Sequence, residues 1–477
     1  MRERTLGALL AGNTAIALLL GSAAMAAEQK VGLQEQTAVA VTIYNENLAL
    51  VRDRRRVPLE QGENHLAFVD VSAMIRPETA LLTSPDTPLS ILEQNFDFDL
   101  LTPEKLLEKS VGDKVRVVTT IPQTGVETVE EAIVLSTASG VVLQIGDRIE
   151  TNPRGRIVFS GVPADLRARP TLVLDVDSGK AGTAPVELSY LTGGLGWRAD
   201  YVAKLVADES TIDLNGLVTL TNTSGTTYRD AKLQLVAGDV NQVRPQMEQR
   251  VLTAAMPAPA PAPKMAEEAL FEYHLYSLDR PTTIAQNQTK QVALLSGSGI
   301  PVRKEYRFTG LSQAYDYQSG DEQRVNALVR LVFDNNEASK LGLPLPKGIV
   351  RVYKDDSNGQ ALFVGEDEIE HTPKNEVVRL NLGQAFDVTA RSRQTDYQKL
   401  GARSYEIAFS VEIRNAKKQA ITATVLETIP GEWKMVEESL PHDSPNSNQA
   451  QWAVPVPAEG KTVLTYRVRT QIGRAHV

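Results

Sequence analysis

The stretch Tyr405-Glu-Ile-Ala-Phe-Ser-Val-Glu-Ile-Arg414 decides the fold, because its apolar and polar residues alternate. Ile407, Phe409, Val411 and Ile413 fall on one face, and mostly polar side chains fall on the other. A period of two is typical of an antiparallel strand with one buried face. The stretch therefore predicts a strand that packs one side against a core and turns the other to solvent.

The same alternation recurs along the chain, for example at 115–121, 329–333 and 462–470. Segments rich in glycine, asparagine, aspartate and serine separate the apolar runs, as expected of turns between strands. No apolar pattern keeps helical spacing over four turns, so neither a coiled coil nor a helical bundle is predicted. These patterns predict an all-β protein.

One short helix is predicted after Thr102. This threonine is a suitable N-cap, and Pro103 occupies the first helical position, where its missing N–H costs nothing. The helix should end near Val111 and Gly112. Residues 114–159 then hold several short strands separated by glycine turns, which is typical of a small barrel.

Together these patterns predict an all-β, multi-domain β-sandwich (immunoglobulin-like) architecture with a small inserted β-barrel module and one short helix. The predicted boundaries are 1–26 for a signal peptide, 27–95 for an N-terminal β segment, 96–165 for a small β-barrel-like insert, 166–395 for a central β-sandwich domain with a Pro-Ala loop at 245–268, 396–471 for a C-terminal immunoglobulin-like β-sandwich, and 472–477 for a non-native tail.

A weak internal repeat links the predicted central and C-terminal β regions. Asn222 ends an alternating run, and Gly238 follows it at the end of the next apolar run. Asn415 ends another such run, and Gly431 follows it at the same spacing. Both segments predict a strand, a polar turn, a second strand and a glycine, which is consistent with two sandwiches that use similar hairpins.

The N-terminus has the features of an export signal. Arg2 and Arg4 precede an apolar stretch at 6–20, and Ala24-Met25-Ala26 fits the rule for signal peptidase. A retained membrane anchor is the alternative, but the apolar stretch is shorter than the ~20 residues that span a bilayer. We expect cleavage after Ala26, a periplasmic or secreted location, and no membrane span after cleavage.

Composition excludes several classes of function. The 477 residues contain no cysteine, which rules out disulfides, thiolate metal sites and a thiol nucleophile. The formal charge of −9 disfavours a dedicated nucleic-acid binder, which normally has a basic face. We therefore expect no nucleic-acid partner. The sequence leaves the oligomeric state open.

Local motifs assign no catalytic, cofactor-binding or metal-binding residue. The histidines are widely separated in the sequence, so no local zinc motif exists, and we expect surface or packing roles for them. Gly194-Leu-Gly-Trp-Arg-Ala199 matches a dinucleotide-binding pattern, but a strand rather than a helix is predicted after it. We interpret this match as a tight turn or bulge before a strand.

One acidic loop can be compared with calcium sites. Asp355-Asp-Ser-Asn-Gly359 is followed by Glu366, Asp367 and Glu368, which could supply oxygen ligands. The calcium-loop register fails, however, because its first position falls on Lys354. A type I′ hairpin turn at Asn358 and Gly359 accounts for the loop without a metal, and we favour it.

Several segments in order resemble the secreted family that carries domain of unknown function 4139, which is related to mucoidy inhibitor A-like proteins. The resembling segments are Val41-Thr-Ile-Tyr-Asn45 with Leu48-Ala-Leu-Val51, Leu188-Ser-Tyr190 with Gly196-Trp197 and Tyr201, Val218-Thr-Leu-Thr-Asn222 with Gly225 and Leu233, Tyr276-Ser-Leu278 with Thr289-Lys-Gln291, Gly348-Ile-Val-Arg-Val-Tyr353 with Gly365-Glu-Asp-Glu-Ile369, and Asn415 with Gly431-Glu-Trp433. The resemblance implies an envelope-localised β protein. It supplies no catalytic residues.

Two functional hypotheses remain. The leading one is a non-enzymatic protein that binds an envelope protein or a glycan, or organises the envelope, because sandwich edges and loops offer binding surfaces and catalytic motifs are missing. The alternative is a secreted hydrolase of glycans or peptides, whose two carboxylates the fold would bring together. An outer-membrane barrel is disfavoured by the few aromatic residues and by charges on both strand faces.

Overall fold

A computed structural model describes residues 28–45, 47–97, 99–122, 124–163, 166–238, 240–241, 265–270, 273–312 and 314–472. The predicted signal peptide, most of the predicted Pro-Ala loop and all but the first residue of the predicted tail lie outside these residues. The described chain is built of five sheets, so the all-β prediction is confirmed.

The chain divides into two compact units, and each is described by itself. Unit 1 comprises Met1–Thr37, Arg54–Val71 and Leu82–Glu187, as far as these are described. Unit 2 comprises Ala38–Asp53, Ser72–Leu81 and Leu188–Val477. Both units are assembled from separate segments, so a boundary in the sequence does not coincide with a boundary in the fold. The predicted module boundaries stay predictions.

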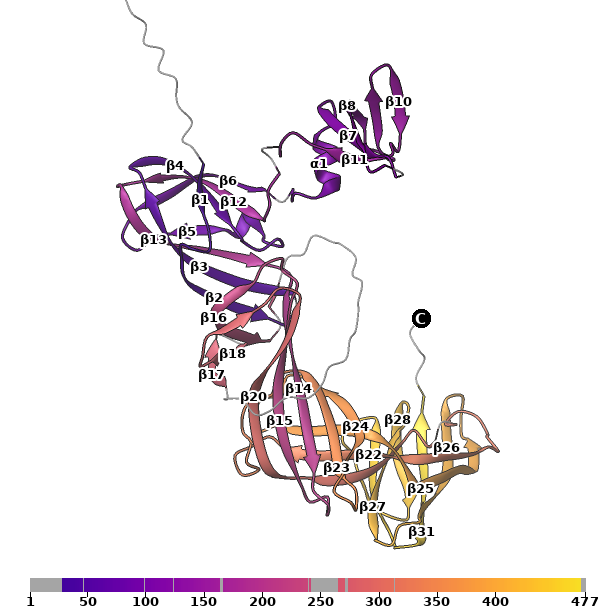
Figure 1. Cartoon of the computed structure of the whole chain (residues 1–477). Helices are drawn as coiled ribbons and strands as arrows, with labels where there is room; N and C mark the ends of the chain where they lie inside the picture. Colours follow the sequence, from indigo (N-terminus) through magenta and orange to yellow (C-terminus); the bar gives the residue numbers. More distant parts are fainter. Residues whose placement is uncertain are drawn as a thin grey trace, which may run out of the picture. The chain divides into compact units, whose positions relative to one another are not determined.

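Unit 1 holds two sheets (Figure 1). The four-stranded sheet has the order β1 (Gln29–Val31), β4 (Gly62–Val69), β12 (Thr171–Ser178) and β6 (Leu89–Asp97). The five-stranded sheet has the order β10 (Arg148–Thr151), β9 (Val142–Ile145), β8 (Glu127–Ser136), β7 (Lys114–Thr120) and β11 (Arg156–Val158).

The second sheet of unit 1 is the predicted insert, and its own apolar core includes Val117, Val134 and Leu143. Its strands form an open sheet, because β10 and β11 lie at opposite edges and do not pair among the described residues. This finding corrects the predicted barrel. Glycine turns correctly indicated several short strands, but the edge strands, of four and three residues, stay unpaired with each other.

The single predicted helix is confirmed as α1 (Pro103–Lys109), the only α-helix of the described residues. The Thr102 hydroxyl accepts a hydrogen bond from the Lys105 N–H at 3.2 Å, as its N-cap position predicts. Leu107 packs on the core of the insert. A single 3-10 turn, η1 (Pro77–Thr79), lies elsewhere in the described chain. No described helix is long and apolar enough to cross a bilayer.

An eight-stranded sheet includes strands whose residues are divided between the units. Its order is β17 (Met265–Leu270), β18 (Tyr273–Leu278), β16 (Tyr228–Ala237), β2 (Gln36–Tyr44), β3 (Leu48–Leu59), β13 (Gly182–Thr192) and β5 (Leu81–Thr83), with β19 (Thr282–Ile284) paired to β16.

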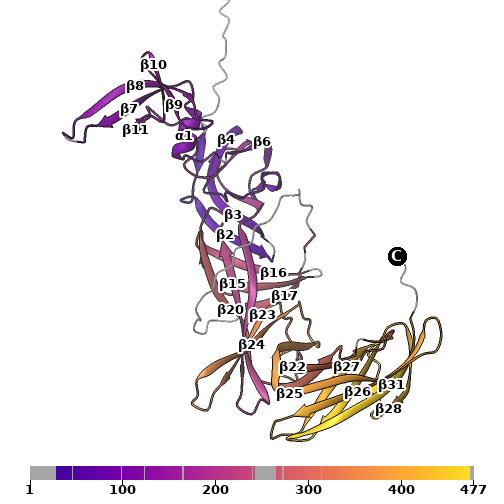
Figure 2. The ribbon, with the colours of Figure 1, turned by 90° about the vertical axis from the view of Figure 1, so that its right-hand side faces the viewer.

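Unit 2 also contains a five-stranded sheet that positions the candidate site. Its order is β20 (Gln288–Pro301), β15 (Thr211–Asn222), β14 (Leu195–Leu205), β23 (Gly348–Asp355) and β24 (Ala361–Ile369). Figure 2 shows the long strands β15, β20 and β23 running together. Strands β14 and β23 are parallel neighbours although they lie far apart in the sequence, with Ala199 opposite Gly348.

The last sheet has nine strands and encloses one core. Its order is β28 (Glu432–Glu438), β31 (Gly460–Gln471), β26 (Ser404–Asn415), β25 (Val377–Lys399), β22 (Glu322–Asp334), β21 (Arg303–Thr309), β27 (Ile421–Thr428), β30 (Gln449–Val456) and β29 (His442–Asp443). Three of these strands, β21, β22 and β25, begin before the predicted C-terminal module.

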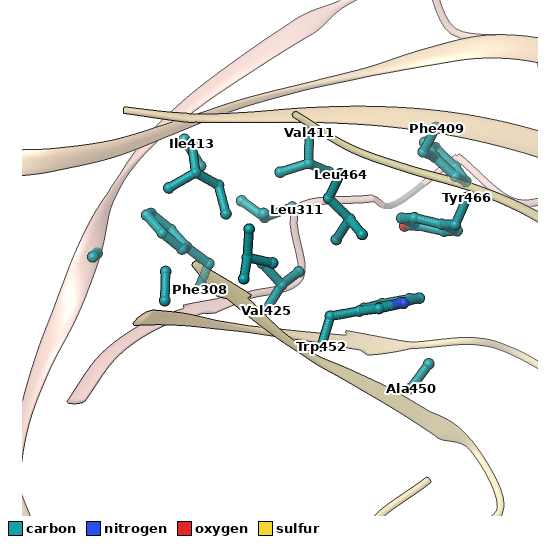
Figure 3. Close-up of a cluster of buried hydrophobic side chains, with 14 of the residues drawn as sticks. Phe308, Leu311, Phe409, Val411, Ile413, Val425, Ala450, Trp452, Leu464 and Tyr466 are labelled. Carbon is teal, nitrogen blue, oxygen red and sulfur yellow. The ribbon is translucent and has the colours of Figure 1, made fainter. Parts of the chain in front are cut away.

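This sheet folds over so that distant strands face each other. The predicted strand at 405–414 is confirmed within β26, and its four inward residues are all buried. Figure 3 shows Val411 and Ile413 facing Val425 across the core. Trp452 on β30 stacks on Tyr466 on β31 with ring centroids 4.7 Å apart. One hydrogen-bonded sheet thus supplies both layers of a sandwich.

Candidate functional site

A cleft of about 450 Å³ lies within unit 2, where the ends of several strands meet. Five separate segments supply its walls. The lining residues are Tyr44, Asn45, Trp197, Arg198, Ala199, Gly238, Val240, Lys347, Gly348, Ile349, Glu368, Glu370 and His371. A volume of this size is within the range of small-molecule sites, which fall between about 300 and 1,000 Å³.

The floor of the cleft depends on a close approach of two strands. A Cβ atom on Gly348 would lie 2.2 Å from the backbone oxygen of Ala199. Only glycine therefore lets β23 pair with β14 at this register. Trp197 and Arg198 precede the paired residues on β14 and reach the cleft from there.

Trp197 lines the cleft and carries a buried hydrogen-bond donor. Its side chain is almost fully buried, at 5% exposure, and its indole nitrogen Nε1 has no hydrogen-bond partner among the described residues. A buried N–H without a partner costs roughly 1–3 kcal/mol. Unsatisfied groups of this kind are rare in folded proteins, so each calls for a physical explanation.

Asn45 and His371 form a second polar feature of the wall. The Asn45 carboxamide nitrogen lies 3.2 Å from His371 Nε2, and no described group hydrogen-bonds to the buried carboxamide oxygen. The backbone N–H of Lys347 donates to His371 Nδ1 at 3.1 Å, so Nε2 carries the hydrogen of the neutral ring. Two N–H donors cannot bond to each other, so the carboxamide oxygen is the end that must meet His371 Nε2–H.

The charges of the cleft compensate one another. Lys347 Nζ lies 3.2 Å from Glu370 and 3.7 Å from Glu368. The hydrogen bond with Glu370 and the charges of both glutamates raise the pKa of Lys347. All three side chains are substantially exposed, and the glutamates are 58% and 78% exposed. The cleft therefore carries no large excess of either charge.

A buried ionic network holds Arg198 at the rim. Asp200 is 5% exposed and accepts hydrogen bonds from Thr219, Arg351 and Arg198 at 2.6, 2.9 and 3.2 Å. Burial alone would raise the pKa of Asp200, but the hydrogen bonds from Thr219 and Arg351 outweigh it and hold the pKa below its ordinary value. Asp200 thus stays ionised and keeps both arginines in place.

A smaller cavity of about 210 Å³ adjoins the cleft, because Gly238 and His371 line both. Its walls are largely apolar and aromatic, with Tyr276 and three prolines among them. The Tyr276 hydroxyl donates to the backbone oxygen of Pro344 at 3.1 Å, which fixes the ring against this wall. Gly238 and His371 are thus shared by the walls of both cavities.

The family model for the domain of unknown function DUF4139 matches residues 186–473. The chain belongs to the DUF4139 family. No curated protein matches it. The matched DUF4139 region supplies Trp197, Lys347 and His371, whereas Asn45 comes from the chain that precedes it.

The acidic loop of the DUF4139 region does not gather its carboxylates. Asp355 pairs with Lys204, and Asp356 accepts from the backbone N–H groups of Asn358 and Gln360. No described group of three or more histidine, aspartate or glutamate side chains is placed to hold a metal ion. The loop is the predicted hairpin turn between β23 and β24.

The type of this turn differs from the prediction. The Gly359 N–H donates to the Asp356 oxygen at 3.1 Å, and Gly359 has a φ of 78°. A type I′ turn at Asn358 and Gly359 would need positive φ at both residues, and of the two only Gly359 has it. The loop is instead one residue longer, with Gly359 as the left-handed residue that follows a type I turn.

Sequence reasoning missed the cleft residues for identifiable reasons. Trp197 stood inside the dinucleotide-like match, which the structure shows as a turn entering β14. His371 was expected to have a surface or packing role, and only the fold brings it to Asn45, 326 residues away in sequence. A tryptophan next to a glycine turn was the one local signal.

Proposed function

We propose that this DUF4139 protein is a non-enzymatic binding protein and that the cleft lined by Trp197, Asn45, Lys347 and His371 is its ligand site. The observation that carries the proposal is at Trp197, a residue that lines the cleft and whose buried indole N–H has no partner among the described residues. A ligand that accepts this hydrogen bond would offset the cost of roughly 1–3 kcal/mol for the unsatisfied group.

Binding is favoured over hydrolysis by the exposure of the two carboxylates in the cleft. A carboxylate pair that hydrolyses glycosides needs one acid kept protonated, usually by burial. Glu368 and Glu370 are more than half exposed, at 58% and 78%, so neither is kept in an apolar environment. Neither is placed to act as a general acid.

The protein is further proposed to act in the periplasm or outside the cell. This part of the proposal is supported by the predicted signal sequence at 1–26 and by the ordered resemblance to mucoidy inhibitor A-like proteins. An envelope protein or a glycan is the proposed partner class.

Hydrogen exchange of the full mature chain tests the site. The chain is incubated with a soluble extract of the producing organism's envelope, and amide exchange is compared with and without the extract. We expect slower exchange at 195–199 and 346–349, and no change at 463–468 on β31. Protection elsewhere, or nowhere, contradicts the proposal.

The hydrolase alternative is tested in the same mixture by mass spectrometry of the extract. Unchanged composition is expected. Turnover that disappears in both Glu368→Gln and Glu370→Gln, but persists in Glu366→Gln on the same strand, would establish the hydrolase instead.

A further inference from the structure

We infer that the ligand of the cleft is a neutral oligosaccharide. This inference rests on the proposed function and names the chemical class that the site would recognise. Three features of the described residues carry it: the compensated charge of the cleft, its unsatisfied polar atoms and the apolar cavity that adjoins it.

Charge compensation selects against a strongly charged ligand. The lining contains two cations and two carboxylates, and each cation already contacts an acid, Lys347 with Glu370 and Arg198 with Asp200. An anionic or cationic ligand would have to displace one of these pairs. A neutral ligand leaves them intact and uses their remaining hydrogen-bonding capacity.

The unsatisfied atoms call for a ligand with hydroxyl groups. Trp197 and Asn45 both line the cleft, and each has a buried polar atom without a described partner, the indole N–H and the carboxamide oxygen. A hydroxyl group donates one hydrogen bond and accepts two, so it can satisfy either atom in either orientation of the carboxamide. Sugars carry several such groups on one small ring.

The adjoining cavity extends the site for a second sugar unit. Tyr276 and the prolines 344, 346 and 373 present apolar surface there, which suits the C–H faces of a pyranose ring. The larger cavity, of about 450 Å³, is the polar one, and the smaller, of about 210 Å³, is the apolar one. This sequence of surfaces matches a short chain rather than a monosaccharide.

A peptide is the competing class. Extended peptides are usually held by main-chain hydrogen bonds to a strand edge, with pockets for alternate side chains. In this cleft the unsatisfied groups belong to the side chains of Trp197 and Asn45. Recognition by side-chain groups of both donor and acceptor character favours the glycan.

Isothermal titration calorimetry of the full mature chain tests the inference. The probes are tetramers of β-1,4-linked N-acetylglucosamine, β-1,4-linked glucose and α-1,4-linked glucose, with tetra-alanine as the peptide probe. We expect one-to-one binding of at least one sugar tetramer and none of tetra-alanine. Trp197→Phe should weaken sugar binding by about 3- to 12-fold, the value of one hydrogen bond.

Trp433→Phe is the matched control, because the Trp433 N–H donates to the Ser447 oxygen outside the cleft. It should leave sugar binding unchanged. Binding of no sugar tetramer, or binding that Trp197→Phe leaves intact, overturns the inference. If envelope extract still protects 195–199 and 346–349 from exchange in that case, the proposed function stands with another ligand class; if it does not, both fail.

Discussion

Asn222 and Asn415 make the same three hydrogen bonds at the ends of β15 and β26. Each carboxamide oxygen accepts from the backbone N–H two residues on, at 3.0 Å in both cases. Each nitrogen donates to the backbone oxygen four residues on, at 2.9 and 2.8 Å. Each nitrogen also donates to a third segment, at Ile284 and Pro457. One side chain thus holds a turn between two strands that do not pair with each other, and fixes this turn to a third segment.

Replacing either asparagine should destabilise the turn that it holds. Both side chains are buried, so Asn222→Ala or Asn415→Ala removes three hydrogen bonds to backbone groups, at a cost of about 2–4 kcal/mol for each variant. Urea unfolding followed by hydrogen exchange of β15 and β26 measures this loss. Asn326→Ala on the exposed face of β22 is the control and should change stability by less than about 0.5 kcal/mol. Equal effects at all three sites would contradict the assigned role.

The two asparagines also show which parts of the structure the sequence can predict. The alternation before each asparagine predicted its strand and the polar residues after it predicted a turn, because these features are local. The predicted hairpins are wrong, because β15 and β16 lie in different sheets and β26 and β27 are not neighbours in the nine-stranded sheet. The contacts with Ile284 and Pro457 span 62 and 42 residues and follow only from tertiary structure. The cleft also follows only from tertiary structure, because Asn45 and His371 are brought together by sheets that no local sequence pattern specifies.

Glu427 should make stability depend on pH. It is fully buried on β27, Oε2 accepts from the Ser312 N–H at 3.3 Å, and Oε1 has no partner among the described groups. Burial raises the pKa of Glu427 to about 8. In the unfolded chain the Glu427 carboxyl ionises near its ordinary pKa of 4.5. The protonated Glu427 side chain therefore makes its full contribution to folding stability below pH 4.5, and this contribution is lost as pH rises toward 8.

Glu427→Gln should abolish this dependence. At pH 7 we expect the variant to exceed the parent in unfolding free energy by about 3 kcal/mol, since each pKa unit corresponds to about 1.36 kcal/mol. Near pH 4 the two proteins should be alike. Urea unfolding at pH 4, 5.5, 7 and 8 measures the difference. A constant difference across this range would show that Glu427 does not titrate on folding.

Arg167 should hold the first described strand in place. Its guanidinium donates to both carboxylate oxygens of Glu28, at 2.8 and 2.6 Å, and to Asp97 at 2.8 Å. The hydrogen bond from Arg167 lowers the pKa of Glu28. This contribution to stability is therefore present above about pH 4.5, the ordinary value, and is lost as pH falls.

Glu28→Gln should accelerate amide exchange in β1 by about 10- to 100-fold at neutral pH, because a charged hydrogen-bonded pair contributes about 1.5–3 kcal/mol. The parent should approach the variant as the pH falls below 4. Glu63→Gln, at an exposed position of β4 in the same sheet, is the control and should leave β1 unchanged. Loss of protection with Glu63→Gln as well would point to general charge effects.

Gly348→Ala should separate β14 from β23 at the floor of the cleft. The new methyl group would overlap the Ala199 backbone, which cannot move aside as a flexible side chain could. We expect a loss of about 2–3 kcal/mol and faster exchange at Ala199. Gly320→Ala, with open space around its Cβ position, is the control. Comparable stability of the two variants would contradict the close pairing of these strands.

Two tryptophans should respond differently to the same substitution. The Trp197 N–H has no described partner, whereas the Trp452 N–H donates to Glu438 at 3.0 Å and its ring stacks on Tyr466. Both side chains are buried, so Trp→Phe removes similar volume at each site. The substitution at Trp452 also breaks a hydrogen bond to a carboxylate, which contributes about 1.5–3 kcal/mol.

We therefore expect Trp452→Phe to cost about 2 kcal/mol more than Trp197→Phe in urea unfolding without ligand. At Trp197 the loss of ring contacts is partly offset, because an unsatisfied buried donor is removed with it. If Trp197 served folding alone, Trp197→Phe would lower the unfolding free energy more than Trp452→Phe does. If Trp197→Phe proves the more damaging change, the indole N–H has a structural partner in the folded protein, and the argument that it awaits a ligand fails.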